Sequence, residues 1–255
     1  MSLRHAFDSP DSKRRYNRQL FSTIADRYDL ITAVLSYGQD ARWKKRLVAD
    51  AAVSGSDRAL DLACGTGDIT FAVAAQGART IGLDLTLRML DLAKQKQAIG
   101  IPDGHHFPAS GTSRPASRPV SFAQGDMSSL PFAASTFDLV TTGYGLRNVP
   151  DLCAAIDEIA RVLKPGGRLL SLDFNRPRSH MVRAAYLSYL SVVGSVLGWI
   201  LHGDPDTYRY IAASLERYPG ADGVAQVLTA SGFTNIRIVP LLGGLMSLHS
   251  AHRPR

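Results

Sequence analysis

The chain contains little cysteine and less acid than base. Its 255 residues include two cysteines, Cys64 and Cys153, which form neither a C-x-x-C pair nor a metal-ligand spacing. We therefore expect no metal site, a reduced intracellular setting, and a packing role for Cys64. The 29 Lys and Arg residues outnumber the 22 Asp and Glu residues, which gives a net charge of +7 at pH 7.

The first ten residues contain no apolar run of signal-peptide length. The predicted localisation is cytoplasmic, with peripheral contact to a membrane left open. Much of the positive charge lies at residues 13–15 with Arg18 and at Arg42 with residues 44–46. We favour a solvated surface for both clusters, and an anionic membrane surface is the second interpretation. Because no nucleic-acid-binding motif accompanies the charge, we expect no nucleic-acid partner.

The stretch at residues 59–68 (ALDLACGTGD) is the centre of the prediction. Its apolar start is typical of a buried parallel strand, and Gly65 and Gly67 allow a tight turn into a helix near Asp68. A second apolar run ends in Asp84, about 20 residues past the turn, where nucleotide-binding α/β folds place the carboxylate for the ribose hydroxyls. This spacing predicts a nucleoside-containing ligand.

The missing third glycine argues against a dinucleotide. A G-x-G-x-x-G turn would need glycine at Thr70, and Asp68 puts negative charge where a pyrophosphate would bind. S-adenosylmethionine has a ribose and no phosphate, so it fits better. Asp61, Gly65 and Gly67 resemble motif I (D-x-x-x-G-x-G) of the class I methyltransferases. The alternative is a tight turn that binds nothing.

Alternating patterns predict an α/β fold with a mostly parallel sheet and helices on both faces. The expected strands are 59–63, 80–84, 120–124, 137–142 and 168–173, and the expected helices are 68–76, 86–97 and 151–163. The short Gly243-Gly244 link predicts an antiparallel hairpin of strands 235–240 and 245–251, after a helix at 222–230. A seven-stranded sheet that ends in such a hairpin is the Rossmann-like class I methyltransferase arrangement.

The domain prediction is a mobile polar arm at 1–20 and one domain at 21–255. Phe21, Ile24, Tyr28 and Ile31 recur at helical spacing, and a second helix is expected at 41–52. A stretch rich in proline, glycine and serine at 100–119 predicts a surface loop, interpreted as an idle insertion rather than a lid. Residues 184–201 carry no charge, and we expect a helical segment at about 181–215 to cover the substrate; a purely structural helix is equally favoured.

Asp126 follows the strand predicted at 120–124. An acid at this carboxyl end of the sheet would meet the adenine amino group of the same ligand. A solvent-facing aspartate is the alternative. We favour the adenine contact over this alternative, because the glycine turn and Asp84 fit the same nucleoside.

A narrower resemblance begins at residues 144–149 (YGLRNV), which are similar to the F-G-L-R-N-V signature of the ubiquinone/menaquinone biosynthesis C-methyltransferase family (UbiE/MenG). Other family elements resemble residues 27–30 (RYDL), 35–38 (LSYG) with 42–44 (RWK), and 161–167 (RVLKPGG). Residues 206–210 (DTYRY), Tyr218-Pro219 and His249 agree with its C-terminal half. The match spans roughly residues 20–252 and is interrupted by the 100–119 stretch.

The resemblance implies a cofactor site for S-adenosylmethionine at Thr66, Asp84, Asp126, Met127 and Gly143. The backbone at residues 65–67 would hold the methionyl end. It also implies a demethylated prenyl quinol as acceptor, methylated at a ring carbon. That reaction needs a base or a positioned water, because a ring hydroxyl and then the methylated carbon lose protons.

The candidates for catalysis are Tyr28, Asp29, Arg147, Tyr208 and His249. Arg147 is the natural partner of a phenolate because it stays charged. For His249 we slightly prefer the interpretation of a satisfied histidine on the last strand. The general base stays open, as do a benzoquinol or naphthoquinol ring and a homodimer.

Departures from the family pattern keep other functions open. Ile31-Thr32 replaces Met-Asn, Gly143 stands where serine is frequent, and Tyr144 replaces Phe. A related methyltransferase acting on another small aromatic or polyketide acceptor is therefore the first alternative. A catalytically silent binding or scaffold protein that kept the fold is the second.

Overall fold

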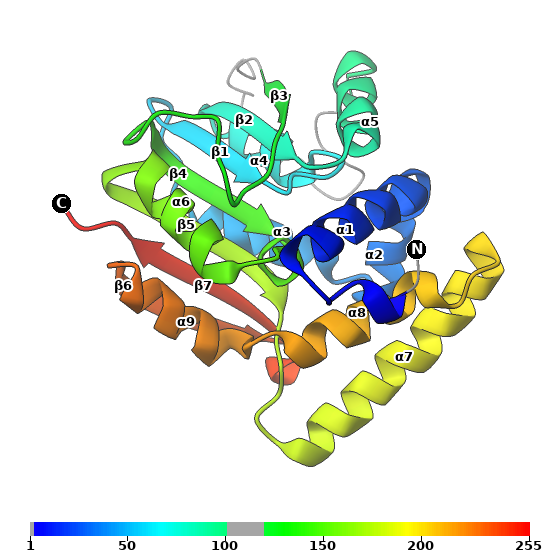
Figure 1. The fold of residues 1–255 in the computed structure, drawn as a ribbon. Coiled ribbons are helices and arrows are strands. Elements are labelled where there is room, and N and C mark those ends of the chain that lie inside the picture. Colours follow the sequence, from blue (N-terminus) through cyan, green and yellow to red (C-terminus); the bar gives the residue numbers. More distant parts are fainter. Residues whose placement is uncertain (1–2, 101–119) are drawn as a thin grey trace.

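A single sheet of seven strands runs through the molecule in the computed structural model, which describes residues 3–100 and 120–255 (Figure 1). The strand order is β3-β2-β1-β4-β5-β7-β6. Strands β1 to β5 are parallel, and β7 lies antiparallel to both β5 and β6. This confirms the predicted class, including the antiparallel hairpin. The strands are β1 (Arg58–Leu62), β2 (Arg79–Asp84), β3 (Ser121–Gln124), β4 (Phe137–Gly143), β5 (Leu163–Phe174), β6 (Thr234–Leu241) and β7 (Met246–His252).

Helices connect and cover these strands. The α-helices are α1 (Pro10–Ile24), α2 (Tyr28–Leu35), α3 (Asp40–Asp50), α4 (Asp68–Ala75), α5 (Leu87–Ala98), α6 (Leu152–Val162), α7 (His180–His202), α8 (Asp206–Arg217) and α9 (Gly220–Ala230). Short 3₁₀ turns are η1 (Leu3–His5), η2 (Ala25–Arg27), η3 (Leu146–Asn148) and η4 (Leu242–Gly244). The predicted helices at 68–76, 86–97 and 151–163 agree with α4, α5 and α6 to within about two residues.

Alternate residues of the central strands build two cores on opposite faces of the sheet. In β4, Leu139 packs with the side chains of α3 and α4, and the next residue, Val140, packs with those of α6 and α9. A third cluster joins α1, α2 and α8. In Figure 1 the arrowhead of β4 points toward α1 and α2, so this third cluster closes the carboxyl end of the sheet.

The prediction of a mobile arm at 1–20 is wrong for residues 10–20, which belong to α1. Ser9 is the N-cap and accepts a hydrogen bond from the Ser12 backbone, and Pro10 occupies the first turn, where its missing N–H costs nothing. Tyr16 and Leu20, spaced by four residues, are buried against α8. The many charges of this stretch suggested solvent, but the helix is packed on the domain, and Lys13 and Arg14 make contacts with it.

The single amphipathic helix expected around 20–31 is divided in the structure. Helix α1 ends at Ile24, a 3₁₀ turn follows, and α2 begins at Tyr28. The break changes the direction of the chain, and all four apolar residues of the predicted stripe still line or border one cavity. The predicted helix at 41–52 is α3.

The loop predicted at 100–119 lies outside the described residues from position 101 onward. The segment predicted at 181–215 is helical, as α7 and α8. Helix α7 is long and apolar enough to cross a membrane by length and composition alone, and 17% of its apolar window is buried. Core helices of soluble proteins pass the same test, so this feature alone decides nothing.

Candidate functional site

The turn between β1 and α4 forms the floor of the site. Gly65 has a φ of +55° and Gly67 a φ of +93°, a left-handed backbone that glycine adopts without strain. A Cβ on Gly67 would lie 2.7 Å from the Phe71 ring, so a larger residue would also clash. The carboxylate of Asp61 is buried below the turn and accepts hydrogen bonds from the hydroxyls of Thr70 (2.6 Å) and Thr141 (2.8 Å). Burial raises the pKa of Asp61 to about 7, although the two hydroxyls lower it.

A cavity of about 720 Å³, partly open to solvent, lies at the carboxyl ends of β1, β2 and β4. We call it the cofactor cavity. Its walls include Gly65, Asp84, Asp126, Met127 and Gly143. The structure thus brings together five of the residues predicted for the cofactor. A smaller neighbouring cavity of about 320 Å³ is lined by Asp61, Thr66 and the same Gly65.

Asp84 ends β2 with both carboxylate oxygens anchored. Oδ2 accepts from the Gly65 backbone (2.9 Å) and Oδ1 from the Thr86 backbone (2.8 Å). Each oxygen keeps a further lone pair for a ribose hydroxyl. Burial raises the pKa of Asp84, and these two backbone donors oppose the shift.

Asp126 is held by a residue that the sequence did not suggest. Its Oδ2 accepts from Nε of Arg14 on α1 at 2.5 Å, and its Oδ1 accepts from the Ser128 backbone at 2.8 Å. Arg14 also lines the cofactor cavity. The helix predicted as a free arm therefore reaches over the position expected for adenine.

The same helix binds the backbone of the signature segment. Lys13 Nζ donates to the carbonyls of Arg147 (3.2 Å) and Val149 (2.6 Å), and Asn17 Nδ2 donates to the carbonyl of Asn148 (2.6 Å). Burial, together with Arg147 and Arg217, lowers the pKa of Lys13 to about 8. The sequence contained one indication of this helix, because the Ser-Pro-Asp start of α1 is a typical helix N-terminus.

A second cavity, of about 740 Å³, lies beside the first between α1, α2, α7 and α8. We call it the acceptor cavity. Four side chains line both cavities: Phe21, Tyr28, Tyr144 and Asn148. Tyr28 and Tyr144 also line the small cavity at the glycine turn. A ligand in one cavity and a ligand in the other would therefore meet at these two tyrosines, and burial raises the pKa of Tyr28 to about 12.

Arg147 is the cation in the lining of the acceptor cavity. Its Nη1 donates to Ser214, its Nε lies 3.5 Å from Asp173 Oδ1, and its guanidinium carbon lies 5.0 Å from the centroid of the Phe174 ring. Its backbone N–H also donates to Asp173 Oδ2 at 3.0 Å. Its side chain is 5% exposed, and its Nε has no hydrogen-bond partner among the described residues. A guanidinium that lines an apolar cavity is a site where an anionic oxygen can bind.

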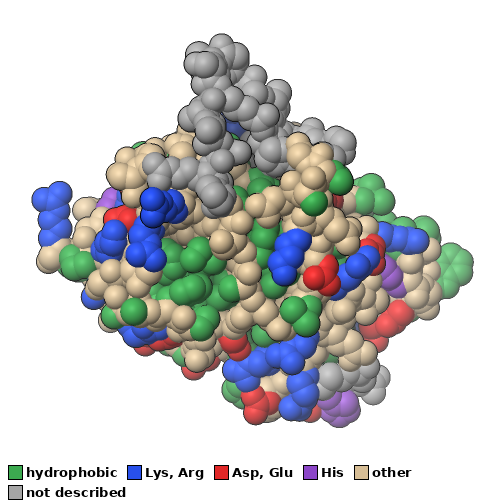
Figure 2. Space-filling view, turned by 90° about the horizontal axis from the view of Figure 1, so that it is seen from above, with side chains coloured by type: hydrophobic (Ala, Val, Ile, Leu, Met, Phe, Trp, Pro, Cys, Tyr) green, Lys and Arg blue, Asp and Glu red, His purple; other side chains and the backbone are tan. Residues whose placement is uncertain are grey.

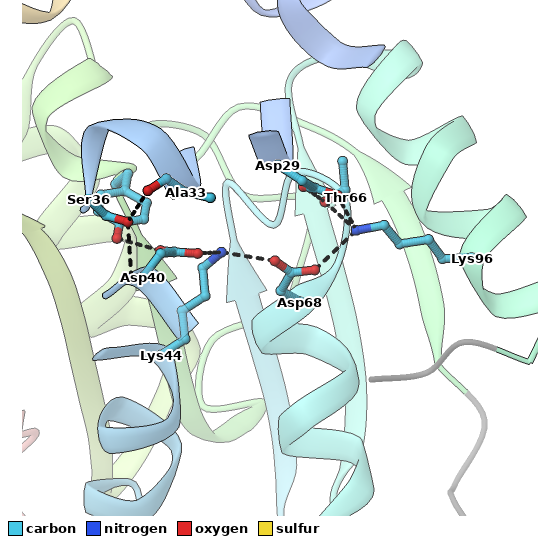
Figure 3. A network of polar contacts seen from close by, with 9 residues as sticks. Asp29, Ala33, Ser36, Asp40, Lys44, Thr66, Asp68 and Lys96 are labelled. Atoms are coloured by element: carbon cyan, nitrogen blue, oxygen red, sulfur yellow. Dashed lines mark hydrogen bonds and ion pairs between the residues drawn. The ribbon is translucent and has the colours of Figure 1, made fainter. Parts of the chain in front are cut away.

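Tyr144, whose ring lines all three cavities, connects them to a chain of buried charges. Its hydroxyl donates to Asp40 Oδ1 at 2.6 Å. Lys44 donates to Asp40 (2.6 Å) and to Asp68 (2.9 Å), as Figure 3 shows. Burial and Asp40 raise the pKa of Tyr144 well above its ordinary value.

Lys96 extends this chain from the other side (Figure 3). Its ammonium donates to Asp68 Oδ1 (3.1 Å), Asp29 Oδ2 (2.7 Å) and Thr66 Oγ1 (2.8 Å). Burial alone would raise the pKa of Asp68, but Lys44 and Lys96 hold it well below its usual range. Lys44 was predicted to lie on a solvated surface. That prediction is wrong, because Lys44 is buried between two carboxylates.

The structure does not bring all five predicted catalytic residues together. Tyr28, Arg147 and Tyr208 line the acceptor cavity, and the Tyr208 hydroxyl lies 2.9 Å from Nε2 of His202. Asp29 instead accepts from Thr66 and Lys96, and it is not among the residues that line either cavity. His249 is buried in β7 with Nε2 3.0 Å from the Ala221 carbonyl, away from both cavities' linings, which agrees with the preferred structural interpretation.

Comparisons with known proteins identify the family of this chain. The model of the ubiE/COQ5 methyltransferase family matches residues 9–253. A demethylmenaquinone methyltransferase from Mycobacterium sp. (strain KMS) is 35% identical over 92% of this chain and 93% of its own length. The ubiquinone/menaquinone biosynthesis C-methyltransferase UbiE of Syntrophotalea carbinolica is 37% identical over the same shares. A demethylmenaquinone methyltransferase from Staphylococcus aureus is 30% identical over 97% of both chains.

Solved structures share the fold at low identity. A SAM-dependent methyltransferase from Thermotoga maritima gives a TM-score of 0.64 at 15% identity, covering 92% of this chain and 99% of that one. A phosphoethanolamine N-methyltransferase from Haemonchus contortus, solved with S-adenosyl-L-methionine, gives 0.58 at 15%, covering 84% and 53%. At these identities the likeness extends to the fold alone.

Proposed function

The chain belongs to the ubiE/COQ5 methyltransferase family and is an S-adenosylmethionine-dependent methyltransferase; we propose that it methylates a ring carbon of a demethylated prenyl quinol in menaquinone or ubiquinone biosynthesis. Demethylmenaquinol is the first acceptor to test, because relatives from Mycobacterium and Staphylococcus carry that activity in their names. The observation that carries the proposal is the pair of cavities that share Tyr28 and Tyr144. One cavity suits a nucleoside and the other suits an apolar ring.

The residues of the cofactor cavity fit S-adenosylmethionine. Asp84 offers two anchored oxygens to the ribose, and Met89 and Met127 offer apolar walls to a purine. A Cβ at Gly143 would lie 2.7 Å from Ile69 Cδ1, so the packing of Ile69 at this wall requires glycine. When bound, the cofactor supplies a sulfonium methyl group that needs no further activation.

The acceptor cavity suits a flat apolar ring with ionisable oxygens. Its lining combines aromatic and aliphatic side chains with Arg147. We assign Arg147 to a ring oxygen as it loses its proton, because a fixed guanidinium in a buried site stabilises a phenolate strongly. The apolar walls limit the access of bulk water, which would otherwise compete for the methyl group.

A proton acceptor is needed beside that oxygen. The described residues that line the acceptor cavity include no carboxylate and no imidazole. Among its tyrosines, Tyr144 is hydrogen-bonded to a carboxylate, that of Asp40. We assign the pair to proton transfer: Tyr144 Oη receives the proton of the ring hydroxyl while its own proton passes to Asp40 Oδ1.

The electron pair of the broken O–H bond stays on the ring oxygen and raises the electron density at the neighbouring ring carbon, which makes that carbon a better nucleophile. After that carbon is methylated, it loses its hydrogen as a proton to water, and the C–H electron pair restores the aromatic ring. Asp40 then returns its proton through Tyr144 to the ring oxygen. The pair ends in its starting state, and one proton is released for each methyl transferred.

A second acceptor class is favoured by one observation. Thr32, where the family pattern has a larger polar residue, lines the acceptor cavity. A different small aromatic or polyketide acceptor would use the same cofactor cavity and the same pair.

Methylation of short-tailed demethylmenaquinol or of the demethylated ubiquinol precursor, followed by mass spectrometry, tests the leading proposal. A methylated product from either supports it. Tight binding of the cofactor with no product from either would favour the second class. Failure to bind the cofactor at all would support a silent scaffold.

A further inference from the structure

Helix α7 presents a line of large apolar side chains to solvent. Met181, Val182, Val192, Val196, Trp199 and Ile200 are between 49% and 82% exposed. We call these six residues the outer stripe. They lie in the first turn and in the C-terminal half of a helix of 23 residues, which is about 34 Å long at 1.5 Å per residue. Exposed apolar surface of this extent marks a contact that the chain makes with something else.

The opposite side of α7 is fixed to the domain. Tyr186, Leu190, Gly194 and Gly198 are buried at four-residue spacing. A Cβ on Gly194 would lie 2.9 Å from the Tyr208 carbonyl oxygen, so α7 and α8 are in backbone contact. A helix held lengthwise in this way lies along the domain surface, so it can lie on a bilayer but cannot cross one alone (Figure 1).

The apolar surface continues from α7 onto α2 and the turn after it. Leu30, Val34 and Tyr37 are 58%, 46% and 53% exposed. The Tyr37 ring stacks on Tyr189 of α7 at 5.9 Å, so the two elements are neighbours. Tyr37 also lines the acceptor cavity, as does Leu242, which is 38% exposed. The mouth of the acceptor cavity therefore lies within the apolar surface.

Within α7 itself the charge is of one sign, and the exposed Asp204 follows its C-terminal end. The sequence of α7 contains no acidic residue. Arg183 lies in its first turns, and Arg27 donates to the Leu201 carbonyl at its end (2.8 Å). Within the described part of the chain, neither arginine is paired with a carboxylate. At the edge of the molecule where α7 ends in Figure 1, Figure 2 shows apolar side chains beside basic, acidic and histidine side chains.

We propose that the outer stripe of α7, with Leu30, Val34 and Tyr37, docks on an anionic lipid bilayer and holds the mouth of the acceptor cavity against it. This inference rests on the proposed function, because a long apolar prenyl tail stays in the bilayer. The ring can then enter the cavity while the tail remains in lipid. Apolar side chains and a tryptophan would enter the interfacial region, and the arginines would meet lipid phosphates.

A second copy of the chain is a poorer occupant. A stripe of about 34 Å by about 10 Å covers roughly 340 Å² per partner, below the roughly 800 Å² of a stable interface. A partner placed there would also cover the mouth through which the tail must leave.

The chain contains its own reporter for the test. It has two tryptophans; Trp43 is buried, and Trp199 is 69% exposed in the outer stripe. Vesicles of phosphatidylglycerol and phosphatidylcholine should shift the tryptophan emission to shorter wavelength, and brominated lipids should quench it. The double variant Val192→Glu/Val196→Glu keeps the reporter and should bind vesicles at least about 10-fold more weakly. Leu87→Glu, at a residue of α5 that is 56% exposed, is the matched control and should bind like the wild type.

Several results would overturn this inference. Unchanged emission at saturating lipid would show that Trp199 does not enter the bilayer. A double variant that binds as tightly as the wild type would show that the outer stripe does not bind lipid. A wild-type dimer that the double variant dissociates, without vesicle binding, would assign the stripe to a second copy. Retention on vesicles after an alkaline carbonate wash would indicate a spanning helix instead.

Activity separates this inference from the proposed function. The double variant should methylate a water-soluble short-tailed quinol like the wild type and lose most of its activity on a long-tailed quinol in vesicles. Equal activity on both would contradict docking. Wild-type protein that binds vesicles and cofactor but methylates no quinol would instead overturn the proposed function.

Discussion

The Tyr144 hydroxyl donates to Asp40 Oδ1 at 2.6 Å, and this contact joins the two ligand cavities to a buried charge network. Tyr144 has a φ of +61°, so its ring is held in place by an unusual backbone conformation at the end of β4. Asp40 lies behind it, balanced by Lys44, and does not itself line the acceptor cavity. Asp40 would therefore exchange a proton with a ring bound in that cavity only through the Tyr144 hydroxyl.

Tyr144→Phe should lower kcat by at least about 10-fold, because it removes the hydroxyl that passes the proton and keeps the ring that shapes the cavity. The loss should shrink as the pH rises, since more of the quinol is then ionised without help. Steady-state rates between pH 6 and 10 would measure this.

Tyr186→Phe is the matched control, because Tyr186 lines the same cavity and its hydroxyl has no carboxylate partner among the described residues. If Tyr144→Phe and Tyr186→Phe gave the same small change at every pH, the assignment of proton transfer to Tyr144 would fail.

Asp84→Ala should weaken binding of S-adenosylmethionine by about 1–3 kcal/mol, because the ribose hydroxyls lose their acceptor. Isothermal titration calorimetry would measure the change. Asp138→Ala is the control, since Asp138 lies at the amino end of β4 and pairs with Lys164 there. An unchanged affinity for Asp84→Ala would mean that the cofactor binds elsewhere.

Arg147→Lys should reduce kcat on the order of 100-fold while the cofactor Kd stays within about twofold. Lysine keeps a positive charge for the buried Asp173, so the variant should fold, but it loses the planar fork that we assign to the ring oxygen. Equal losses of turnover and of cofactor affinity would indicate a structural role for Arg147.

Asp61 should make folding stability depend on pH. Burial raises its pKa to about 7, whereas in the unfolded chain the group ionises near pH 4. Between these values the unfolded chain releases a proton that the folded chain keeps, so this contribution to the free energy of unfolding falls as the pH rises from about 4 to about 7.

Asp61→Asn removes that contribution. Urea unfolding of both proteins at several pH values should show the wild type losing stability relative to the variant across this window. A constant difference between the two curves would mean that Asp61 is ionised in the folded state throughout.

Much of the fold could be predicted because its signals are local. Apolar runs, glycine turns and the Gly243-Gly244 link indicated the strands, the alternation and the terminal hairpin, which the strand order confirms. The cofactor residues follow strand ends, and the carboxyl ends of parallel strands meet at one edge. The structure accordingly brings Gly65, Asp84 and Asp126 to one cavity.

The remaining features depend on contacts between distant parts of the chain. Lys44 looked like part of a surface cluster because its neighbours in sequence are basic, yet Asp68 and Asp40 bury it. Arg14 and Asn17 looked like a polar arm, and only the packing of Tyr16 and Leu20 on α8 brings them over the site. For the same reason, the acceptor cavity between α1, α2, α7 and α8 could not be read from any single stretch.

The most direct measurement of the central claim is methyl transfer itself. The purified protein would be incubated with S-adenosylmethionine and, in separate reactions, with short-tailed demethylmenaquinol and the demethylated ubiquinol precursor, and the products would be identified by mass spectrometry. We predict that one ring hydrogen is replaced by a methyl group in at least one quinol, with demethylmenaquinol the preferred acceptor. Cofactor binding without methylation of either quinol would contradict the account.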